Sequence, residues 1–520
     1  MATNGKITLD DIKRDESRWV LDSVDKIVFW IEYQLEEQEK ASLKNNMPPF
    51  RCINLSKCII YTDTTQDGKP TMTNLYLLAG KINCIKDKTN QESPFHQEVL
   101  LPFICDHSII YAPYFHQTKF HDYFSLSHTQ IHGGGSFGSC TFEGDFYAQK
   151  TDFGQCGDFL FTKFKKDVNF SGAKFSAPNI DFSRLIFHGN VSFNSIVLKE
   201  REDYRDTIIT FYQSVFHRNF KMESTSLQRA CTFEQCQFHG DISLNKISSS
   251  SVISFSGASV FKQLLISIED ENQTYELNNL YLNNSRLFDR IDIEGYSIAS
   301  LSACFAHING LCIFRLYHCK IDNLDMNSIY NSGFIYFSRN NIAKISLEDA
   351  IGRGVIEVNQ NNNPEIAGIA DRRTARLLKD SAIKGNNAID AVKFKRIEAE
   401  KYLKEGIECH EKILFYLNRY SNKHGTSWLR ALRVTLLITL LFCILILCFG
   451  ETATSSQNIL EVSCNHFIKT YFGLLDITNF GGNLQGMHFN GFGYALFYLA
   501  KILIAYGYYQ FISAFRKYGR

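Results

Sequence analysis

Phenylalanine returns every five or six residues along much of the segment between Thr141 and Val197. An amphipathic helix would place its apolar residues three and four apart, and a half-buried strand would place them two apart. The longer step indicates a wound chain in which each short flat side contributes one inward side chain and each coil buries its face against its neighbours. The phenylalanines in this pattern are Phe142, Phe153, Phe159, Phe164, Phe170, Phe175, Phe182, Phe187 and Phe193. We therefore predict a solenoid with an aromatic interior.

Two short stretches carry this pattern most clearly, VNFSGAKF at residues 168–175 and ISFSGASVF at residues 253–261. They resemble the pentapeptide-repeat family. The resemblance implies a mainly β fold, a right-handed quadrilateral β-helix with a central Phe or Leu and about 20 residues per coil. The pattern is looser after about Leu264, where Leu and Ile replace Phe. Residues 198–207 are rich in charge and break the period, so we expect them to loop out from one coil edge.

Two apolar segments follow the repeats. Residues 431–449 are almost wholly apolar, and about 19 residues of helix span roughly 28 Å of hydrocarbon. Residues 492–515 form a second candidate, with tyrosines near the ends and Lys501 near the middle. Tyrosine suits the headgroup level of a bilayer. We predict two transmembrane helices.

Basic residues flank the two predicted spans on their outer sides. Lys423, Arg430 and Arg433 precede the first span, Arg516, Lys517 and Arg520 follow the second, and the loop at 450–491 has Lys469 as its one Lys or Arg. By the positive-inside rule we expect both termini to be cytoplasmic. The first residues lack an apolar signal region, which agrees with a solenoid that is not translocated.

The sequence divides into five predicted parts. These are an amphipathic helical segment at 1–45, a β-rich entry region at 46–135, the solenoid at 136–365, a basic helical neck at 366–427 and a transmembrane hairpin at 428–520. The first segment would cap the solenoid or pack between subunits. Asn386 and Asn387 are expected to divide the neck into two helices.

Charge separates the solenoid from the neck. The chain has a net charge of +1, and residues 136–260 hold 13 acidic and 13 basic side chains. This balance argues against a DNA mimic, which would need an acidic excess. Residues 366–433 hold 15 Lys and Arg against 8 Asp and Glu. Such an excess beside an apolar segment points to a membrane surface.

The neck contains a basic cluster with two open interpretations. It consists of Arg372, Arg373, Arg376, Lys379 and Lys384. As a solvated helix face it would be attracted to anionic lipid by about 1 kcal/mol per charge. As a binding site it would take a phosphorylated ligand or an oligonucleotide, because Arg pairs bidentately with phosphate.

Lys501 is the most unusual residue of the predicted spans. An ammonium near the midplane costs about 2.5 kcal/mol or more, so it should face a water-filled path or an acidic partner. We assign Lys501, Phe497, Ala505 and Tyr508 to a pore-lining face. Two spans cannot enclose a pore, so we expect a homo-oligomer, with a tetramer as the first expectation, in which a ring of Lys501 favours anions. The alternative is a lysine that pairs with Asp476 or snorkels.

Motifs that suggest catalysis or metal binding have structural alternatives. HGGGSFG at residues 132–138 contains a G-x-S-x-G string centred on Ser136, but a hydrolase would need a helix after the serine, and Phe-spaced repeats follow instead. Four histidines, His116, His121, His128 and His132, are expected to be surface or turn residues. The 15 cysteines include no CxxC pair. We predict no enzyme, no cofactor and no metal site.

Residues 465–482, between the spans, are amphipathic and too short to cross a bilayer, which favours a re-entrant or interfacial helix. The order of span, dipping segment and span resembles two-span ion channels, although a TVGYG-like filter is absent. The neck stretch at 376–394, LNRYSNKHGTSWLRAL at 417–432 and YGYYQFISAFRKYG at 506–519 resemble bacterial pentapeptide-repeat membrane proteins.

These proteins look like membrane effectors of anti-phage defence, similar to the channel component of a Hailong-type system. The resemblance implies a plasma-membrane channel that acts by depolarisation, controlled by an oligonucleotide or nucleotide ligand from a partner nucleotidyltransferase. Our leading hypothesis is thus an oligomeric, ion-channel-like effector gated by a cytosolic β-helix. The alternative is a membrane-anchored β-helix scaffold for protein–protein interaction, without a pore.

Overall fold

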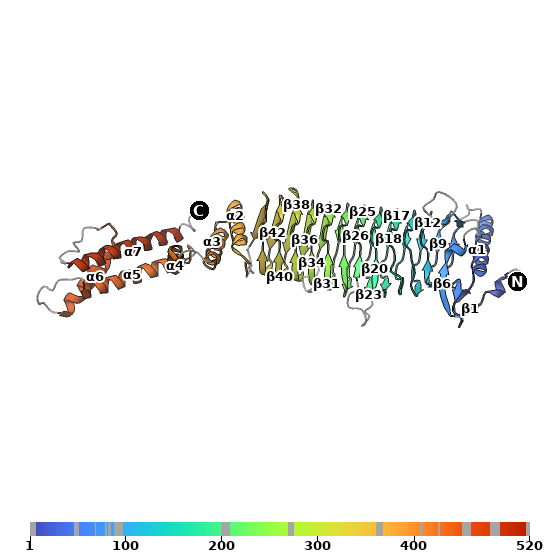
Figure 1. The fold of residues 1–520 in the computed structure, drawn as a ribbon, viewed down its shortest axis with the longest axis horizontal. Helices are drawn as coiled ribbons and strands as arrows, with labels where there is room; N and C mark the ends of the chain where they lie inside the picture. Colours follow the sequence, from blue (N-terminus) through green and yellow to red (C-terminus); the bar gives the residue numbers. More distant parts are fainter. Residues whose placement is uncertain are drawn as a thin grey trace. The chain divides into compact units, whose positions relative to one another are not determined.

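The computed structural model describes residues 7–45, 51–67, 69–78, 81, 85–87, 97–198, 208–268, 275–359, 368–405, 409–424, 427–449, 459–478 and 489–515. The chain forms two compact units, Met1–Gly368 and Ile369–Arg520. The first is a parallel β-solenoid of about 11 turns, and the second is helical (Figure 1). The mainly β solenoid followed by helices is therefore confirmed.

Each of the early coils contributes strands to four walls. The first wall contains β3 (Ile53–Asn54), β9 (Phe103–Ile104), β13 (Phe124–Ser125), β16 (Phe146–Tyr147), β18 (Val168–Asn169), β22 (Val191–Ser192), β26 (Phe220–Lys221), β30 (Ile242–Ser243), β33 (Gln263–Ile266), β36 (Arg290–Glu294), β39 (Ile313–Tyr317), β42 (Phe334–Ser338) and β44 (Val355–Asn359). The second contains β7 (Ile85–Asp87), β8 (Gln97–Val99), β12 (Thr118–Phe120), β15 (Thr141–Phe142), β17 (Lys163–Phe164), β21 (Ile186–Phe187), β25 (Val215–Phe216), β29 (Gln237–Phe238), β32 (Ser259–Val260), β35 (Arg286–Leu287), β38 (His307–Ile308) and β41 (Tyr330–Asn331). The third contains β5 (Asp63–Thr64), β6 (Pro70–Asn74), β11 (Pro113–Tyr114), β20 (Asn179–Asp181), β24 (Ile208–Thr210), β28 (Ala230–Thr232), β31 (Ser248–Ser254), β34 (Glu276–Tyr281), β37 (Ser297–Ser302), β40 (Lys320–Asp325) and β43 (Asn341–Ser346). The fourth contains β1 (Arg14–Asp15), β2 (Arg18–Leu21), β4 (Cys58–Ile60), β10 (Ile109–Tyr111), β14 (Gln130–His132), β19 (Lys174–Phe175), β23 (Val197–Leu198) and β27 (Ser226–Leu227).

The phenylalanine pattern forms continuous ladders inside the solenoid. On the second wall, Phe142 pairs in register with Phe164, and Phe164 pairs with Phe187. Their ring centroids are 5.2 and 5.1 Å apart and the rings are nearly parallel. All three side chains are fully buried. Each coil thus buries its aromatic face against the next, which is the quasi-one-dimensional core expected of a solenoid.

The later coils differ from the expected four-sided shape. Strand β31 pairs with both β27 and β28, which belong to different walls. The third and fourth walls therefore merge at β31, and the following coils pair through three walls, as in β34, β36 and β35. Leucine and isoleucine largely replace phenylalanine in the interior of this part.

The solenoid also begins earlier than residue 136. Ile53 already pairs with Phe103 on the first wall, and Phe103 pairs with Phe124, so this wall extends into the predicted entry region. The same region also contains antiparallel pairs, β5 with β6 and β7 with β8. Helix α1 (Val24–Asn45) covers the start of this wall. Its Trp30 Nε1 donates to the Asn54 carbonyl at 3.2 Å, and its Gln38 side chain accepts from the Cys52 amide at 2.9 Å. The helix is thus a cap, which protects the exposed strand edge. The charged insertion predicted after residue 198 lies outside the described residues.

The helical unit contains six helices in its described residues. They are α2 (Arg372–Lys384), α3 (Ala388–Tyr402), α4 (Cys409–Asn422), α5 (Trp428–Phe449), α6 (Ile459–Leu475) and α7 (Gly491–Phe515). The break at Asn386 and Asn387 is confirmed, and Asn387 caps α3 by accepting from the Asp390 amide. The neck has three helices where two were expected.

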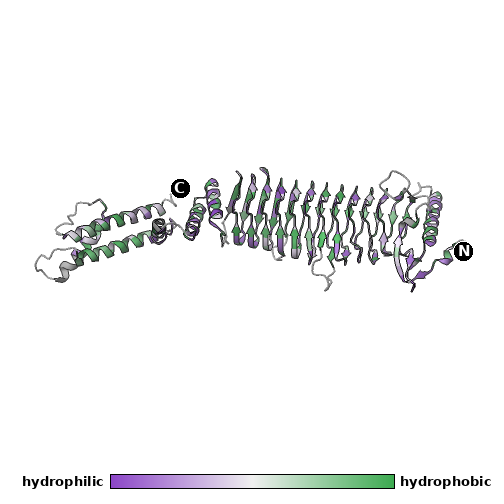
Figure 2. Cartoon of the chain, in the orientation of Figure 1, coloured by the Kyte–Doolittle hydropathy of each residue, from purple (hydrophilic) through white to green (hydrophobic). Residues whose placement is uncertain are grey.

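Helices α5 and α7, with 22 and 25 residues, are long and apolar enough to cross a membrane. Hydrophobic residues, shown in green, lie along both helices (Figure 2). Large exposed side chains such as Leu437, Ile502 and Tyr509 lie on them, and exposed apolar surface on a helix hairpin suits contact with lipid. The two predicted spans are therefore present as helices, and their composition indicates membrane insertion.

Candidate functional site

Helix α6 packs against both apolar helices. The Tyr471 hydroxyl donates to the Leu436 carbonyl of α5 at 3.3 Å. Cys443 Sγ of α5 lies 3.7 Å from the carbonyl oxygen of Phe467. A buried cluster joins the three helices, with Phe442, Cys443, Ile446, Leu474, Phe489, Phe497, Ala500 and Ile504 as its core. The predicted dipping segment thus contains a helix that packs on both helices of the hairpin through apolar contacts.

The C-terminal end of α6 meets Lys501 of α7. The Lys501 ammonium donates to the carbonyl oxygens of Gly473 at 2.8 Å and Leu474 at 3.3 Å, and also to the carbonyl of Asp476. The last carbonyls of a helix have no partner within it. Lys501 therefore supplies donors that α6 lacks, and the negative end of the helix dipole lies against its positive charge.

The other residues assigned to a pore-lining face have different surroundings. Phe497 is buried, and its ring centroid lies 5.2 Å from Lys501 Nζ. Tyr508 is half-buried and donates to the Leu475 carbonyl at 3.2 Å, so it completes the cap on α6. Ala505 is half-buried. Within one chain, three of the four residues thus gather at the end of α6, and pore lining stays a prediction.

Helices α5 and α7 approach closely at Gly507. A Cβ atom on Gly507 would lie 2.3 Å from Oγ1 of Thr435, well inside contact distance. The Thr435 hydroxyl itself donates to the Ala431 carbonyl one turn earlier at 2.8 Å, so its polar atom is satisfied within α5. Small residues that let helix backbones approach are typical of packing in membranes.

An amide cluster ties α4 to α7 and was not foreseen from the sequence. Gln510 Nε2 donates to Asn418 Oδ1 at 2.8 Å, and the Tyr506 hydroxyl donates to the same oxygen at 3.0 Å. Asn422 Nδ2 donates to the side-chain oxygen of Gln510. Asn422 and Gln510 are buried. A glutamine inside an otherwise apolar helix was the signal available, because a buried amide needs partners.

The basic cluster of the neck is largely paired with acidic residues of α3 and the turn after it. Arg376 Nε and Lys379 Nζ lie 2.9 and 2.8 Å from the two carboxylate oxygens of Glu398. Burial alone would raise the pKa of Glu398, but the hydrogen bonds from Lys379 and Arg376 hold that pKa below its ordinary value. Lys384 is exposed. The structure brings Arg376 and Lys379 together through Glu398.

Arg372 belongs to a second contact of the same cluster. Its guanidinium lies 3.0 Å from the Glu405 carboxylate and 3.8 Å from the centre of the Tyr402 ring. Arg373, its neighbour, also interacts within the chain. Stacking and ion pairing of this kind order the guanidinium. A phosphate ligand would therefore have to compete with carboxylates already in place.

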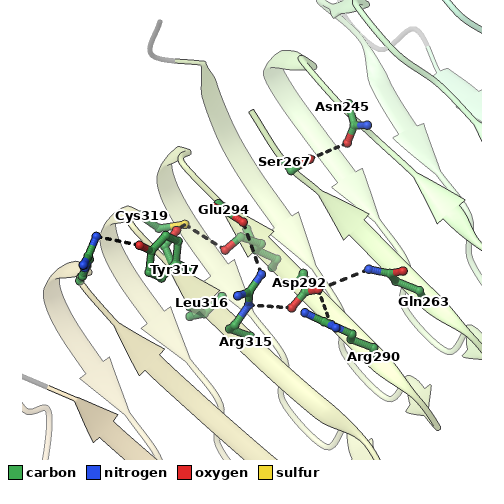
Figure 3. A network of polar contacts seen from close by, with 12 residues as sticks. Asn245, Gln263, Ser267, Arg290, Asp292, Glu294, Arg315, Leu316, Tyr317 and Cys319 are labelled. Atoms are coloured by element: carbon green, nitrogen blue, oxygen red, sulfur yellow. Dashed lines mark hydrogen bonds and ion pairs between the residues drawn. The ribbon is translucent and has the colours of Figure 1, made fainter. Parts of the chain in front are cut away.

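A polar network links neighbouring strands on the first wall of the solenoid (Figure 3). Asp292 is 1 % exposed, and its carboxylate accepts from Arg290 Nε at 2.5 Å and Arg315 Nε at 2.9 Å. Gln263 also donates to it at 3.3 Å. A buried carboxylate with several charged donors is satisfied where it lies. The network joins β33, β36 and β39 and was missed because Asp292 resembles a solvated strand position in the sequence.

The motifs that suggested chemistry lie within coils. The Ser136 hydroxyl donates to the Asp158 carboxylate at 2.7 Å, and the chain after it continues into strands of the solenoid. His121 lies 3.4 Å from Glu98, whereas His128 stacks on His107 with ring centroids 4.7 Å apart. Among the described residues, no group of three or more His, Cys, Asp or Glu side chains could hold a metal ion.

Comparison with known proteins finds no matching family model, no matching curated protein and no matching solved structure.

Proposed function

We propose that this protein is an oligomeric, ion-channel-like membrane effector in which the β-solenoid controls a path formed by α5, α6 and α7. The observation that carries the proposal is the depth at which α6 ends. Lys501 is the eleventh residue of α7 counted from Gly491, which places it about 15 Å along that helix. A helix that ends at membrane depth is found where its end is buried in protein or lines a water-filled cavity, and ion paths of transporters use such ends.

A path of this kind needs more than one copy of the chain, because two spans and one re-entrant helix cannot surround it. We propose a homo-oligomer, with a tetramer as the first arrangement to test. The distribution of Lys and Arg supports a plasma-membrane orientation with both termini in the cytoplasm. The trigger is an oligonucleotide or nucleotide bound by the neck cluster, and opening depolarises the membrane in anti-phage defence. We assign the protein no enzymatic activity.

One observation favours the alternative, a membrane-anchored scaffold without a pore. The Lys501 ammonium is satisfied by carbonyl oxygens of its own chain. The buried charge therefore does not by itself require an oligomer to shelter it. In this alternative the solenoid displays binding surfaces at the membrane, and the helices serve as an anchor.

Purification of the full chain in detergent, followed by mass measurement and reconstitution in planar bilayers, separates the two proposals. The channel proposal expects a defined oligomer, unitary currents, and membrane depolarisation with growth arrest when the protein is expressed in bacteria. A monomer that carries no current in bilayers and leaves the membrane potential unchanged would overturn it and favour the scaffold.

A further inference from the structure

We propose that the C-terminal end of α6 is a monovalent-cation site and that the ammonium of Lys501 occupies it as a tethered cation. The inference rests on the channel proposal where it concerns conduction. It goes further, because it assigns a binding site, its ligand class and the sign of the conducted ion.

The coordination around the Lys501 ammonium resembles that of a bound cation. An ammonium has three donors and no acceptor. Each donor is matched by a main-chain carbonyl, those of Gly473 at 2.8 Å, Leu474 at 3.3 Å and Asp476. The Phe497 ring lies 5.2 Å away on another side, within the range of a cation–π contact. Carbonyl oxygens of this kind also replace the hydration shell of K⁺ in channel filters.

The charge of the protein around this position is negative. The end of α6 carries about half an elementary negative charge from the helix dipole. Asp476 directly follows the helix, and its carboxylate accepts from the Thr478 amide at 3.0 Å and from the Thr478 hydroxyl at 2.6 Å. An anion would be repelled here once the ammonium moves away. The local field thus favours cations, whereas a ring of lysines alone would favour anions.

The site has a built-in means of being emptied. Lysine reaches the carbonyls through a flexible four-carbon stem, so its ammonium can leave without a change in α7. The Tyr508 hydroxyl donates to the Leu475 carbonyl at 3.2 Å, and this hydrogen bond keeps the end of α6 in place while the ammonium is away. A free cation then takes the position of the ammonium. Replacement of the Lys501 ammonium by a free cation would couple cation binding to opening of the path.

The test compares Lys501→Met with Lys469→Met. Methionine keeps much of the length and apolar character of lysine but has no charge, and Lys469 is an exposed lysine of α6 that serves as the control. Thermal unfolding of the full chain in detergent is measured in choline, sodium, potassium and ammonium chloride at equal ionic strength. We expect potassium or ammonium to raise the Tm of the Lys501→Met protein by about 2 °C or more over choline. Wild type and Lys469→Met should show no such difference. Equal behaviour of all three proteins would overturn the site.

Conduction provides a second measurement that needs no variant. In a planar bilayer with a KCl gradient, the inference expects wild-type currents to reverse at a cation-selective potential. Anion-selective currents would overturn the inference and leave the channel proposal intact. Conversely, cation-dependent stabilisation of Lys501→Met without any current would support the site and contradict the channel.

Discussion

The ammonium of Lys501 donates to the carbonyl oxygen of Gly473 at 2.8 Å, which joins the middle of α7 to the last turn of α6. Together with the carbonyls of Leu474 and Asp476, this contact matches the charge of a lysine inside an apolar helix with main-chain oxygens. Helix ends present unpaired carbonyls, and an apolar environment makes each unpaired group costly. A buried lysine and a buried helix end therefore stabilise each other, and either alone would be unfavourable.

At Gly507 the close approach of α5 and α7 leaves no room for a side chain. We expect Gly507→Ala to lower the stability of the helical unit by about 1–3 kcal/mol, because the new methyl group would overlap Thr435 Oγ1. Thermal unfolding of the full chain in detergent measures the effect. Gly491→Ala is the matched control, because a Cβ there meets no atom within 4 Å.

Removal of the obstructing atoms should reverse this effect in part. Thr435→Ala deletes Oγ1 and Cγ2 but leaves Cβ, which would still lie 3.0 Å from the added methyl. We expect the double variant Gly507→Ala, Thr435→Ala to recover part of the lost Tm. If Thr435→Ala made no difference to the Gly507→Ala protein, the close approach of the two helices at this level would be wrong.

The aromatic ladder makes the solenoid sensitive to loss of a single ring. We expect Phe164→Ala to destabilise the protein by about 3–5 kcal/mol, because the ring is fully buried between Phe142 and Phe187. Unfolding followed by circular dichroism in the β region measures this loss. Phe305 is 57 % exposed and has a φ of 56°, a conformation that asparagine tolerates. Phe305→Asn should therefore change stability little, and a loss as large as that of Phe164→Ala would argue against the ladder.

The solenoid could be predicted because its interior repeats. One inward side chain per short side gives a step of five or six residues, so Phe142 and Phe164 reveal the fold even in a single sequence. The merging of two walls at β31 could not be read in this way. The serines at 248–251 are compatible with both a corner and a flat strand. Only the pairing of β31 with both β27 and β28 shows that they form one continuous strand.

The sequence identified Lys501 as a candidate site residue, but it did not identify the groups that contact Lys501. Lys501 stands out against its apolar neighbours, which identified it as costly and in need of a partner. Its partners are main-chain carbonyls of α6, and backbone groups leave no signature in residue types. For the same reason the pairing of Arg376 with Glu398 was hidden, because charge counts do not show which residues of two helices face each other.

Stacked histidines should make the solenoid less stable in acid. His188 stacks on His217 with ring centroids 4.7 Å apart, and His217 stacks on His239 at 5.5 Å. Burial is the main cause that lowers the pKa of His188, and the nearby charges of Lys165 and His217 lower it further. Burial also lowers the pKa of His239, with a smaller contribution from His217. The unfolded chain then binds protons more readily than the folded one. The stability contributed by the neutral rings is thus fully present above the ordinary histidine pKa of about 6.5 and is lost as the pH falls through that region.

Denaturant unfolding at several values between pH 5 and pH 8 measures this dependence. The double variant His188→Asn, His239→Asn should show a flatter dependence of unfolding free energy on pH than wild type. Lys165→Met should flatten it by a smaller amount, because the lysine ammonium lies 3.4 Å from His188 Nε2 and opposes protonation of that ring. An unchanged slope in the double variant would show that other groups govern the acid response.

Glu398 should control how strongly the neck binds polyanions. Its carboxylate neutralises Arg376 and Lys379 at 2.9 and 2.8 Å, so Glu398→Gln would release two cations on α2. We expect that variant to bind a fluorescent single-stranded oligodeoxynucleotide several-fold more tightly at low salt, with a steeper loss of affinity as salt rises. Fluorescence anisotropy on the detergent-solubilised full chain measures both quantities.

Glu400→Gln makes the same change of charge at a carboxylate that pairs with Arg396 on α3, so it is the matched control and should have a smaller effect. Arg376→Gln should weaken binding. If Glu398→Gln and Arg376→Gln both left the affinity unchanged, the basic cluster would not be the ligand site, and its charges would serve to hold α2 against α3.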